Sequence, residues 1–364
     1  MSINNDLSMT VTVPALTDFI AAGLERVGLS ANDALRIAQL MAQADQQGSD
    51  GHGIIRMPQY IKRIQAGGIN VHPSIRVVSE RAGTALVDGD NGMGHLVVSF
   101  ATRLAMDKAA DTGIAWVGTR NSNHAGPASL YARMPLERDM ISLYFAVGNA
   151  NHLPPWGGMT MLLSTNPIAA GIPAAAGTPP IVLDMASTVS AYGKVKATAK
   201  RGEMMPHGWM IDRSGQPLTD PKRADEGFLL PIGGYKGYGL ALIIGLLAGT
   251  LNGAAMGKDV VDFNKDHVTR TNTGQSIMVI DPSAFGDVQH FKAAVASLVH
   301  DISNSARLPG VERIWLPGEQ SHLKREQYAK EGVPIAAGLI SELNELADQL
   351  GIARLKVQES QKIA

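Results

Sequence analysis

An uncharged segment between Lys236 and Lys258 decides first which class of protein this chain can form. The segment is nearly long enough for a membrane span, because about 20 apolar residues cross a bilayer. Small residues recur in it every four positions, a stripe that lets helix backbones approach closely: Gly237, Ala241, Gly245, Gly249, Gly253 and Gly257. Thr250, Asn252 and the glycines disfavour insertion, and no flanking topology signal accompanies the segment. We therefore predict a buried helix at 237–251 in a globular protein, with no membrane partner.

The composition agrees with a globular protein that works on a small molecule. The chain has 364 residues, 45% of them hydrophobic, and a formal net charge of −1. This length predicts roughly two or three compact units at about 100–200 residues each. A nucleic-acid partner would need a clustered basic surface, so none is expected. Charged residues are only 18%, which suggests much buried surface, including a subunit interface.

The absence of cysteine limits the available chemistry. It excludes disulfides, thiolate metal sites and a cysteine nucleophile. Proton transfer therefore falls to His, Lys, Ser, Tyr or a carboxylate. The first ten residues, MSINNDLSMT, have neither the basic nor the apolar region of a secretory signal, so the cytoplasm is the expected location.

The residue pattern changes along the chain. Residues 1–80 are predicted to form a helical N-terminal unit that packs with 290–364, and residues 81–289 an α/β unit. After a β-like stretch at 11–13, one helix opens at Pro14 and ends near Gly28, and Ser30 caps a second through a capping-box pattern with Asp33. Strands are predicted at 84–88, 114–119, 140–147, 180–186 and 276–280. Further helices are predicted at 95–110, 126–133, 237–251 and 335–350, and a loop at 258–275.

The usual nucleotide-binding motifs are missing. GDNGMG at 89–94 and GGYKGYG at 233–239 have the wrong spacing for G-x-G-x-x-G, and no P-loop pattern occurs. A standard Rossmann enzyme or P-loop ATPase is therefore not expected. No H-E-x-x-H or paired histidines at ligand spacing are present, so no metal site is expected either.

Two histidines lie in glycine-rich turns, where a ligand can approach the backbone. His52 and Arg56 are four residues apart and share a face if the turn leads into a helix. A His titrates near neutral pH, and an Arg keeps its positive charge. Side by side they suit proton transfer to a small carboxylate substrate. His124 follows a strand at the start of a helix, where the helix dipole keeps a His neutral and suits a general base. In both cases a plain capping His remains an alternative.

Two other segments carry polar groups among glycines and prolines. Thr165 and Asn166 could hydrogen-bond a ligand or simply form a structural turn. Lys236 lies among four glycines at the start of the apolar helix. It is either a contact to the phosphate or amide of a cofactor or a solvated charge at a helix start.

Taken in order, these segments resemble the malate/L-lactate dehydrogenase family, which is unrelated to the Rossmann enzymes. The resemblance spans nearly the whole chain, and the order of its blocks makes a chance match implausible: ADQQGSDGHGIIRMPQY, GIAWVGTRNSNHAG, PPWGG, STNPIAAGIP, VLDMAS, PHGWMIDRSGQPLTDP, LPIGGYKGYGLAL and LPGE. It implies an α/β fold of its own, with a mixed sheet flanked by helices. It also implies a nicotinamide cofactor, NAD or NADP, bound by the unit at 81–289, and a homodimer with the active site at the interface.

The resemblance also assigns roles to residues. His124 matches the acid–base His of the family, His52 lines the site, and Arg56 holds the substrate carboxylate. Thr165 matches a substrate contact. The remaining matched positions border the cofactor: Asn121, His124, Ala125, Gly126, Asn149, Asp184, Met185, Ala186, Lys236, Pro317, Gly318 and Glu319. The implied reaction is hydride transfer to or from the carbon that bears the hydroxyl or amine, with His124 first and His52 second as proton carriers.

One departure from the family pattern bears on the substrate. The family usually has Ser directly before the first His, and this chain has Gly51 there, after Ser49 and Asp50. Either Ser49 or Asp50 replaces the lost hydroxyl, or the substrate differs from malate and lactate. Asp50 near Arg56 would also repel a dicarboxylate such as malate.

Three hypotheses follow. The first is a dehydrogenase or reductase of a small 2-oxo or 2-hydroxy acid. The second is a reductase of cyclic imino acids such as pyrroline- or piperideine-2-carboxylate, which needs the same His and Arg. The third, suggested by the missing Ser, is an inert member that binds NAD(P) without turnover.

Overall fold

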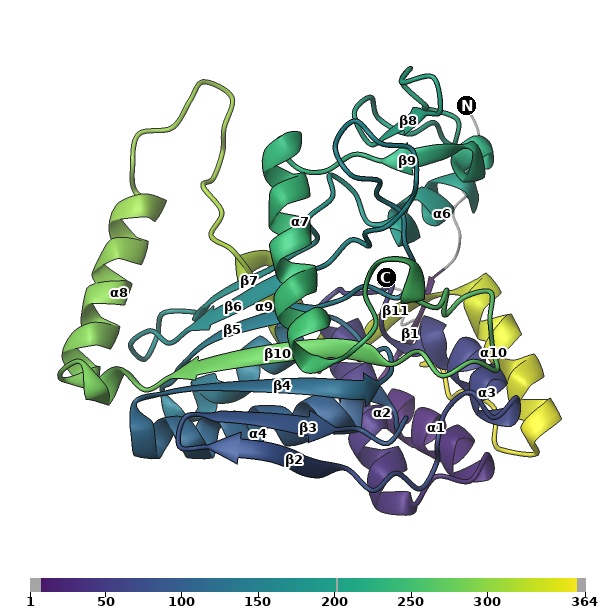
Figure 1. The fold of residues 1–364 in the computed structure, drawn as a ribbon, viewed down its shortest axis with the longest axis horizontal. Coiled ribbons are helices and arrows are strands. Elements are labelled where there is room, and N and C mark those ends of the chain that lie inside the picture. Colours follow the sequence, from purple (N-terminus) through teal and green to yellow (C-terminus); the bar gives the residue numbers. More distant parts are fainter. Residues whose placement is uncertain (1–7, 201, 359–364) are drawn as a thin grey trace, which may run out of the picture.

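A seven-stranded mixed sheet forms the centre of the computed structural model, which describes residues 8–200 and 202–358 (Figure 1). In spatial order the strands are β2 (Arg76–Arg81), β3 (Thr84–Asp88), β4 (Ile114–Ser122), β10 (Thr273–Ile280), β5 (Ile141–Ala146), β6 (Ile168–Ile172) and β7 (Ile181–Met185). Strands β3 and β4 pair in parallel, and every other neighbouring pair is antiparallel. The mixed α/β fold predicted from the sequence is thereby confirmed.

Helices cover both faces of this sheet. Helices α4 (Gly94–Thr112) and α5 (Ser129–Arg133) share one hydrophobic core with the inward side chains of β3, β4, β5 and β10. Helix α7 (Tyr235–Ala248) crosses the opposite face, in front of the sheet in Figure 1. The apolar side of each helix packs on the sheet.

A second core joins the two ends of the described chain. It contains α1 (Val13–Arg26), α2 (Ala31–Gln46), α3 (Met57–Gln65) and α10 (Ala337–Leu350). Strands β1 (Ser8–Val11) and β11 (Val333–Ala336) pair antiparallel beside these helices. Ser30 caps α2 as predicted, because its Oγ accepts a hydrogen bond from Asp33 N at 3.2 Å. Residues 1–7 and 359–364, at the ends of the predicted units, lie outside the described residues. The division near 80 and 290 stays a prediction.

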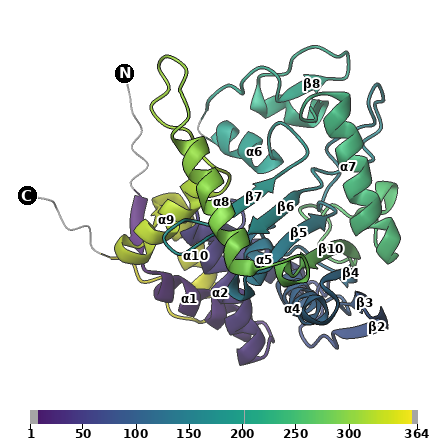
Figure 2. The ribbon, with the colours of Figure 1, turned by 90° about the vertical axis from the view of Figure 1, so that its left-hand side faces the viewer.

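The remaining elements surround the sheet. Helix α6 (Tyr192–Lys200) and the hairpin β8 (Met210–Asp212) and β9 (Gly227–Leu229) form a small cluster with its own apolar core. Helix α8 (Val288–Ser303) runs along the side of the molecule, as Figure 2 shows, and α9 (Glu319–Glu331) precedes β11. The described residues also form short 3₁₀ helices: Ile54–Arg56, Met134–Arg138, Pro221–Glu226, Thr250–Asn252, Gly257–Asp259 and Pro282–Ala284.

The apolar helix differs from its prediction. One face lies close against the sheet, since a Cβ at Gly274 of β10 would be 2.0 Å from the carbonyl oxygen of Ala248. The other face is open: Ile243 is 53% and Leu251 63% exposed. The helix predicted to be buried is therefore buried on one face only, and no segment among the described residues covers its outer face. None of the helices in the described part of the chain is long and apolar enough to cross a membrane.

Five predicted strands are present with shifts of a few residues at their ends. Strand β4 extends to Ser122 instead of ending at 119, and β10 begins at Thr273 instead of 276. The last helix begins at Ala337, two residues after its predicted start, because 333–336 pair with β1. Strands β2 and β6 and helices α6, α8 and α9 are not among the predictions. Strands β2 and β6 and helix α6 are short and α9 is highly charged, so they lack a clear apolar period. Helix α8 is amphipathic, and the prediction missed it.

Candidate active site

A tight turn after α2 carries His52 and leads into α3. Buried Asp45 shapes the turn, since its Oδ2 accepts a hydrogen bond from Ile54 N at 2.7 Å. Its carboxylate packs directly on Gly53, where a Cβ would lie 1.9 Å from Asp45 Oδ1. Only glycine fits this contact. Arg56 ends the following 3₁₀ turn and donates from Nε to the carbonyl oxygen of Gly51 at 2.7 Å.

The second histidine leaves the end of β4. Asn123, one residue earlier, is buried and donates from Nδ2 to the carbonyl oxygens of Asn91 and Gly92, each at 3.0 Å. Gly126, two residues later, has a φ of +78°, a conformation that favours glycine and turns the chain towards α5. This framework fixes the backbone on both sides of His124.

The two turns bring both histidines and a tyrosine into one hydrogen-bonded chain. His52 Nδ1 lies 3.3 Å from His124 Nε2, and the rings are stacked at 5.3 Å. His124 Nδ1 in turn lies 2.5 Å from the hydroxyl oxygen of Tyr60 on α3. Both nitrogens of His124 are therefore engaged. Among the described residues, none hydrogen-bonds His52 Nε2, which leaves this nitrogen as the free end of the chain.

Enclosure by protein keeps these groups neutral. Desolvation, followed by the charge of Arg56, lowers the pKa of His52 to about 4. Desolvation also holds the pKa of His124 well below its usual value, with His52 and Arg56 acting in the same direction. Burial raises the pKa of Tyr60 above its usual range. At neutral pH the chain thus consists of two uncharged imidazoles and one phenol, and which nitrogen carries each proton depends on the tautomers.

His95 on α4 completes the enclosure. Its fully buried ring lies edge-on to Tyr60 at 5.6 Å, and burial lowers its pKa to about 3. Neither of its nitrogens has a partner within the described chain. Phe263 lies 5.5 Å from the ring of His124 and 5.8 Å from that of Tyr60. Apolar rings therefore exclude water from the inner part of the site.

Arg56 reaches the same site from the side of His52. Its NH1 donates to Asn264 Oδ1 at 3.3 Å, and its Nε is used by Gly51. No carboxylate pairs with Arg56 in the described residues, and Asp50 is exposed without an ion pair to it. The Ser49 hydroxyl accepts a hydrogen bond from Gln47 Nε2 at 3.1 Å. That Ser49 or Asp50 replaces the hydroxyl missing at Gly51 stays a prediction.

Of the other predicted ligand contacts, Asn149 is tied to this cluster. Phe263 N donates to the carbonyl oxygen of Asn149 at 3.0 Å, which ties Asn149 to the ring that packs on His124. The carbonyl oxygen of Thr165 accepts from Ser187 N at 2.8 Å, so Thr165 lies next to the segment after β7. Lys236 is exposed in the first turn of α7. Asn166 is a structural residue, because its buried amide bonds Gly148 N and the Ala241 carbonyl.

The other predicted cofactor contacts lie at the ends of β4 and β7. Asn121, with a φ of +49°, donates to Asp88 Oδ2 at 3.0 Å, and Ala125 is buried. Asp184 Oδ2 accepts from Ser129 N at 2.8 Å and so ties β7 to α5. Met185 ends β7, and Ala186 follows it.

Pro317–Glu319 lie further along the edge of β7. The Pro317 carbonyl oxygen accepts from Val182 N at 3.1 Å, and a Cβ at Gly318 would meet the Val182 carbonyl oxygen at 2.4 Å. Glu319 pairs with Arg313. No contact in the described residues joins this segment to His124.

Sequence reasoning missed four residues of the site: Tyr60, His95, Asp45 and Phe263. Tyr60 stands four residues after Arg56, the spacing of one helix face, and could have been found by extending the His52–Arg56 pattern by one turn. Asp45 and Phe263 gave no local signal, because each reaches the site only through the tertiary fold. A buried carboxylate directly before a glycine-rich turn is a pattern to look for in such sequences.

This chain is similar to known proteins in sequence and in fold. A family model described as malate/L-lactate dehydrogenase matches residues 11–344. Malate dehydrogenase of Pyrococcus horikoshii is 38% identical over 349 residues, which cover 93% of this chain and 95% of that protein. Its solved structure superposes with a TM-score of 0.88 at 35% identity, covering 98% and 99% of the two chains.

Two relatives with other activities match at similar coverage. L-sulfolactate dehydrogenase of Methanocaldococcus jannaschii is 36% identical over 329 residues, 90% of this chain and 94% of that protein. A Delta(1)-pyrroline-2-carboxylate/Delta(1)-piperideine-2-carboxylate reductase of Pseudomonas syringae pv. tomato is 33% identical over 342 residues, 93% and 97%.

These matches show that the chain is an enzyme, an oxidoreductase that uses a nicotinamide nucleotide. Within that class, it belongs to the malate/L-lactate dehydrogenase family. The resemblance inferred from the sequence blocks is thereby confirmed.

Proposed function

We propose that the enzyme transfers a hydride between NAD or NADP and the substituted carbon of a small 2-oxo or 2-hydroxy carboxylic acid. The observation that carries this proposal is the chain from Tyr60 through His124 to His52, which ends in a free imidazole nitrogen beside Arg56. An acid–base group next to a fixed positive charge is what a 2-hydroxy acid requires, since its hydroxyl and carboxylate are on adjacent carbons.

The histidine pair acts as one unit. When His124 Nδ1 accepts a hydrogen bond from the Tyr60 hydroxyl, His124 donates from Nε2 to His52 Nδ1, and His52 presents its Nε2–H to a substrate carbonyl. In the reverse arrangement His52 donates from Nδ1 to His124, and its bare Nε2 accepts the proton of a substrate hydroxyl. The two tautomeric arrangements thus serve the two directions of the reaction.

Arg56 provides the carboxylate grip. A guanidinium binds a carboxylate through two parallel hydrogen bonds, which fixes the adjacent carbon relative to His52. A bound carboxylate also offsets the charge of Arg56, one of the causes that lower the pKa of His52. Substrate binding therefore raises the pKa of His52 and makes it a better base in the complex than in the free enzyme.

The predicted cofactor-binding residues fit a nicotinamide nucleotide. Asn149 Nδ2 is buried without a hydrogen-bond partner, and so is Asn151 Oδ1 two residues later. A buried donor and acceptor of this kind match a carboxamide, and Lys236 supplies a cation at the start of α7 for a phosphate. The cofactor supplies the hydride acceptor or donor, while His124, Ala125 and Gly126 border it and Thr165 contacts the substrate.

We also propose a homodimer. The open outer face of α7, with Ile243 and Leu246, and Leu251 of the following 3₁₀ helix form an exposed apolar patch of the kind that marks protein interfaces. A dimer that covers this face would bury the helix, as the sequence predicts. Size-exclusion chromatography with light scattering tests it: Leu246→Glu should give monomer, whereas a wild-type monomer would refute the dimer.

A panel of substrates run with each cofactor tests the activity. Purified enzyme should oxidise NADH or NADPH with pyruvate, oxaloacetate or diketogulonate, measured by the loss of nicotinamide absorbance. Cofactor binding without turnover on any of these compounds or on pyrroline-2-carboxylate would support the inert alternative.

A cyclic imino-acid reductase is the second candidate. The relative from Pseudomonas syringae supports it, and protonation of an imine nitrogen needs the same free nitrogen and the same Arg56. Turnover of pyrroline-2-carboxylate at a higher kcat/KM than every 2-oxo acid would favour this second candidate.

A further inference from the structure

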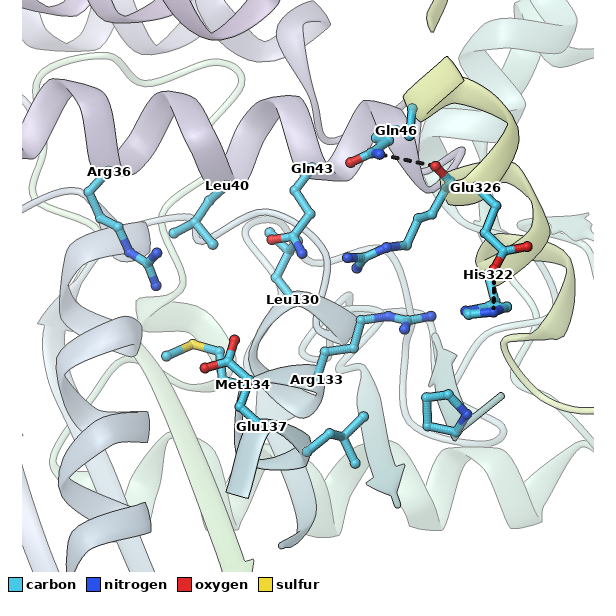
Figure 3. Close-up of a pocket in the computed structure, with 14 residues that line it drawn as sticks. Arg36, Leu40, Gln43, Gln46, Leu130, Arg133, Met134, Glu137, His322 and Glu326 are labelled. Atoms are coloured by element: carbon cyan, nitrogen blue, oxygen red, sulfur yellow. Dashed lines mark hydrogen bonds and ion pairs between the residues drawn. The ribbon is translucent and has the colours of Figure 1, made fainter. Parts of the chain in front are cut away.

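A cavity of about 570 Å³ lies between α2, α5 and α9, away from the histidines (Figure 3). Arg36 and Gln43 reach it from α2, Arg133 from α5, and His322 and Arg325 from α9. Pro180, just before β7, lies at one side. Its volume is within the range of small-molecule sites, about 300–1,000 Å³. Neither the histidine pair nor any residue matched to the cofactor lines it.

Three guanidinium groups share this cavity, and the acids that act on them, Asp184 on Arg133 and Glu137 on Arg36, are not within ion-pair distance. Within the described chain, Arg36, Arg133 and Arg325 form no ion pair. The Nε atoms of Arg36 and Arg133 are buried and have no hydrogen-bond partner. Figure 3 shows Arg36 directed from α2 into the cavity and Arg133 extending towards His322. All three side chains are partly buried, and burial disfavours a charge that lacks a close partner.

The cations also disfavour one another. Desolvation lowers the pKa of Arg133 to about 10, and the charge of Arg325 adds to that effect. Desolvation likewise lowers the pKa of Arg36, with the charge of Arg103 in second place. An arginine stays charged at neutral pH, so it cannot avoid this cost by releasing its proton.

The nearby acids offset the group only in part, since Asp184 on Arg133 and Glu137 on Arg36 are each the smallest of the causes that act on the pKa of that arginine. Glu326 is exposed and lies 3.3 Å from His322 Nε2, and Glu137 is exposed without an ion pair among the described residues. Gln43 satisfies part of Arg325 when its amide oxygen faces the guanidinium, at 3.0 and 3.2 Å. The amide oxygen of Gln43 is an uncharged acceptor, so it does not balance the charge of Arg325. Gln46 bonds only the Arg325 backbone, at 3.0 Å.

We propose that this cavity binds a small, multiply charged anion that carries phosphate or carboxylate groups, at a site separate from the histidine site. Guanidinium groups that converge on one cavity are suited to such ligands, since each offers a planar pair of donors to two oxygens. Convergence from three helices also means that the bound anion holds α2, α5 and α9 together.

The cavity adjoins elements that carry the histidine site. Helix α2 ends at Gln46, a cavity residue, and Gln47 directly after it donates to Ser129 Oγ at 2.9 Å. Ser129 begins α5, which follows His124 and ends at Arg133. An anion bound between these helices can therefore influence the relative position of the two histidine turns.

Binding is tested on the purified full-length protein, without any activity assay. Pyrophosphate and citrate are titrated by calorimetry and by thermal denaturation, in a buffer free of other multivalent anions and at constant ionic strength with KCl. The expected result is saturable binding and a rise in Tm with at least one of them. The two titrations distinguish a phosphate ligand from a carboxylate ligand.

Variants locate the binding. Arg133→Gln and Arg325→Gln should each weaken it about tenfold or more, the loss of one charged hydrogen-bonded contact. Arg138→Gln is the matched control, because Arg138 is exposed and pairs with Asp107 outside the cavity at 2.7 Å.

Three results would overturn the proposal. The first is no saturable binding of either anion. The second is equal weakening by Arg138→Gln. The third is competition between the anion and NADH or NADPH for one site, which would remove the separation from the histidine site.

Discussion

The histidine site and the arginine cavity are two solutions to the same problem, polar groups held inside protein. In the first, His52, His124 and Tyr60 bond one another, and burial removes their charge by lowering or raising their pKa values. In the second, Arg36, Arg133 and Arg325 keep their charge and form no ion pair with an acid among the described residues. The difference teaches that a titratable group can adapt to burial by itself, whereas an arginine needs a ligand or a partner.

Removal of the central histidine should produce the largest effect. We expect His124→Ala to lower kcat by about 10²–10⁴-fold, because general acid–base catalysis contributes that much, while the affinity for the cofactor is largely retained. Stopped-flow turnover and fluorescence titration with NADH or NADPH measure the two effects. His290→Ala, on the exposed surface of α8, is the control and should match wild type. An equal loss of cofactor affinity would make His124 a structural residue.

The carboxylate grip ranks second. Arg56→Ala should raise KM and lower kcat together, about 10–100-fold in kcat/KM, because both the charge and the orientation are lost. Steady-state kinetics on 2-oxo acids measure this, with Arg138→Ala as the control. A KM that does not change for carboxylate substrates would contradict the role of Arg56.

The phenol at the inner end should matter less. Tyr60→Phe removes the hydroxyl that lies 2.5 Å from His124 Nδ1 and keeps the ring that packs on Phe263. We expect kcat to fall about 2–10-fold, the usual worth of one neutral hydrogen bond, with the fold retained. Circular dichroism and kinetics together test this, and a kcat equal to wild type would show that the tyrosine is not part of the proton chain.

The turn before His52 should give the smallest effect. A Cβ at Gly51 would meet nothing within 4 Å, so Gly51→Ser should fold normally. Asp50→Asn should raise kcat/KM for oxaloacetate several-fold relative to pyruvate, by about 0.5–1 kcal/mol, the size of an exposed charge interaction. If oxaloacetate were the best substrate of the wild type, the proposed repulsion between Asp50 and a dicarboxylate would be contradicted.

The sequence predicted the polar residues of the site better than their surroundings. His52, Arg56 and His124 stood out because they are ionisable groups in glycine-rich turns, and the structure brings them together. Tyr60, His95 and the arginines of the cavity did not, since their roles arise from helices that are distant in sequence and pack together. The same limit applies to α7: its apolar residues predicted burial, but a sequence does not say whether its own chain or another one covers them.

The central claim is that the histidine pair is neutral in the free enzyme, and NMR titration of ¹³C-labelled histidine tests it most directly. Both folded pKa values lie below the unfolded value of about 6.5, so the charged form is the disfavoured one. The account predicts that the His52 resonance, assigned with His52→Gln, does not titrate as the pH falls from 8 to 5.5 and begins to shift only towards about 4. The His124 resonance should show no titration over the same range. A midpoint near 6.5 for either residue would contradict it.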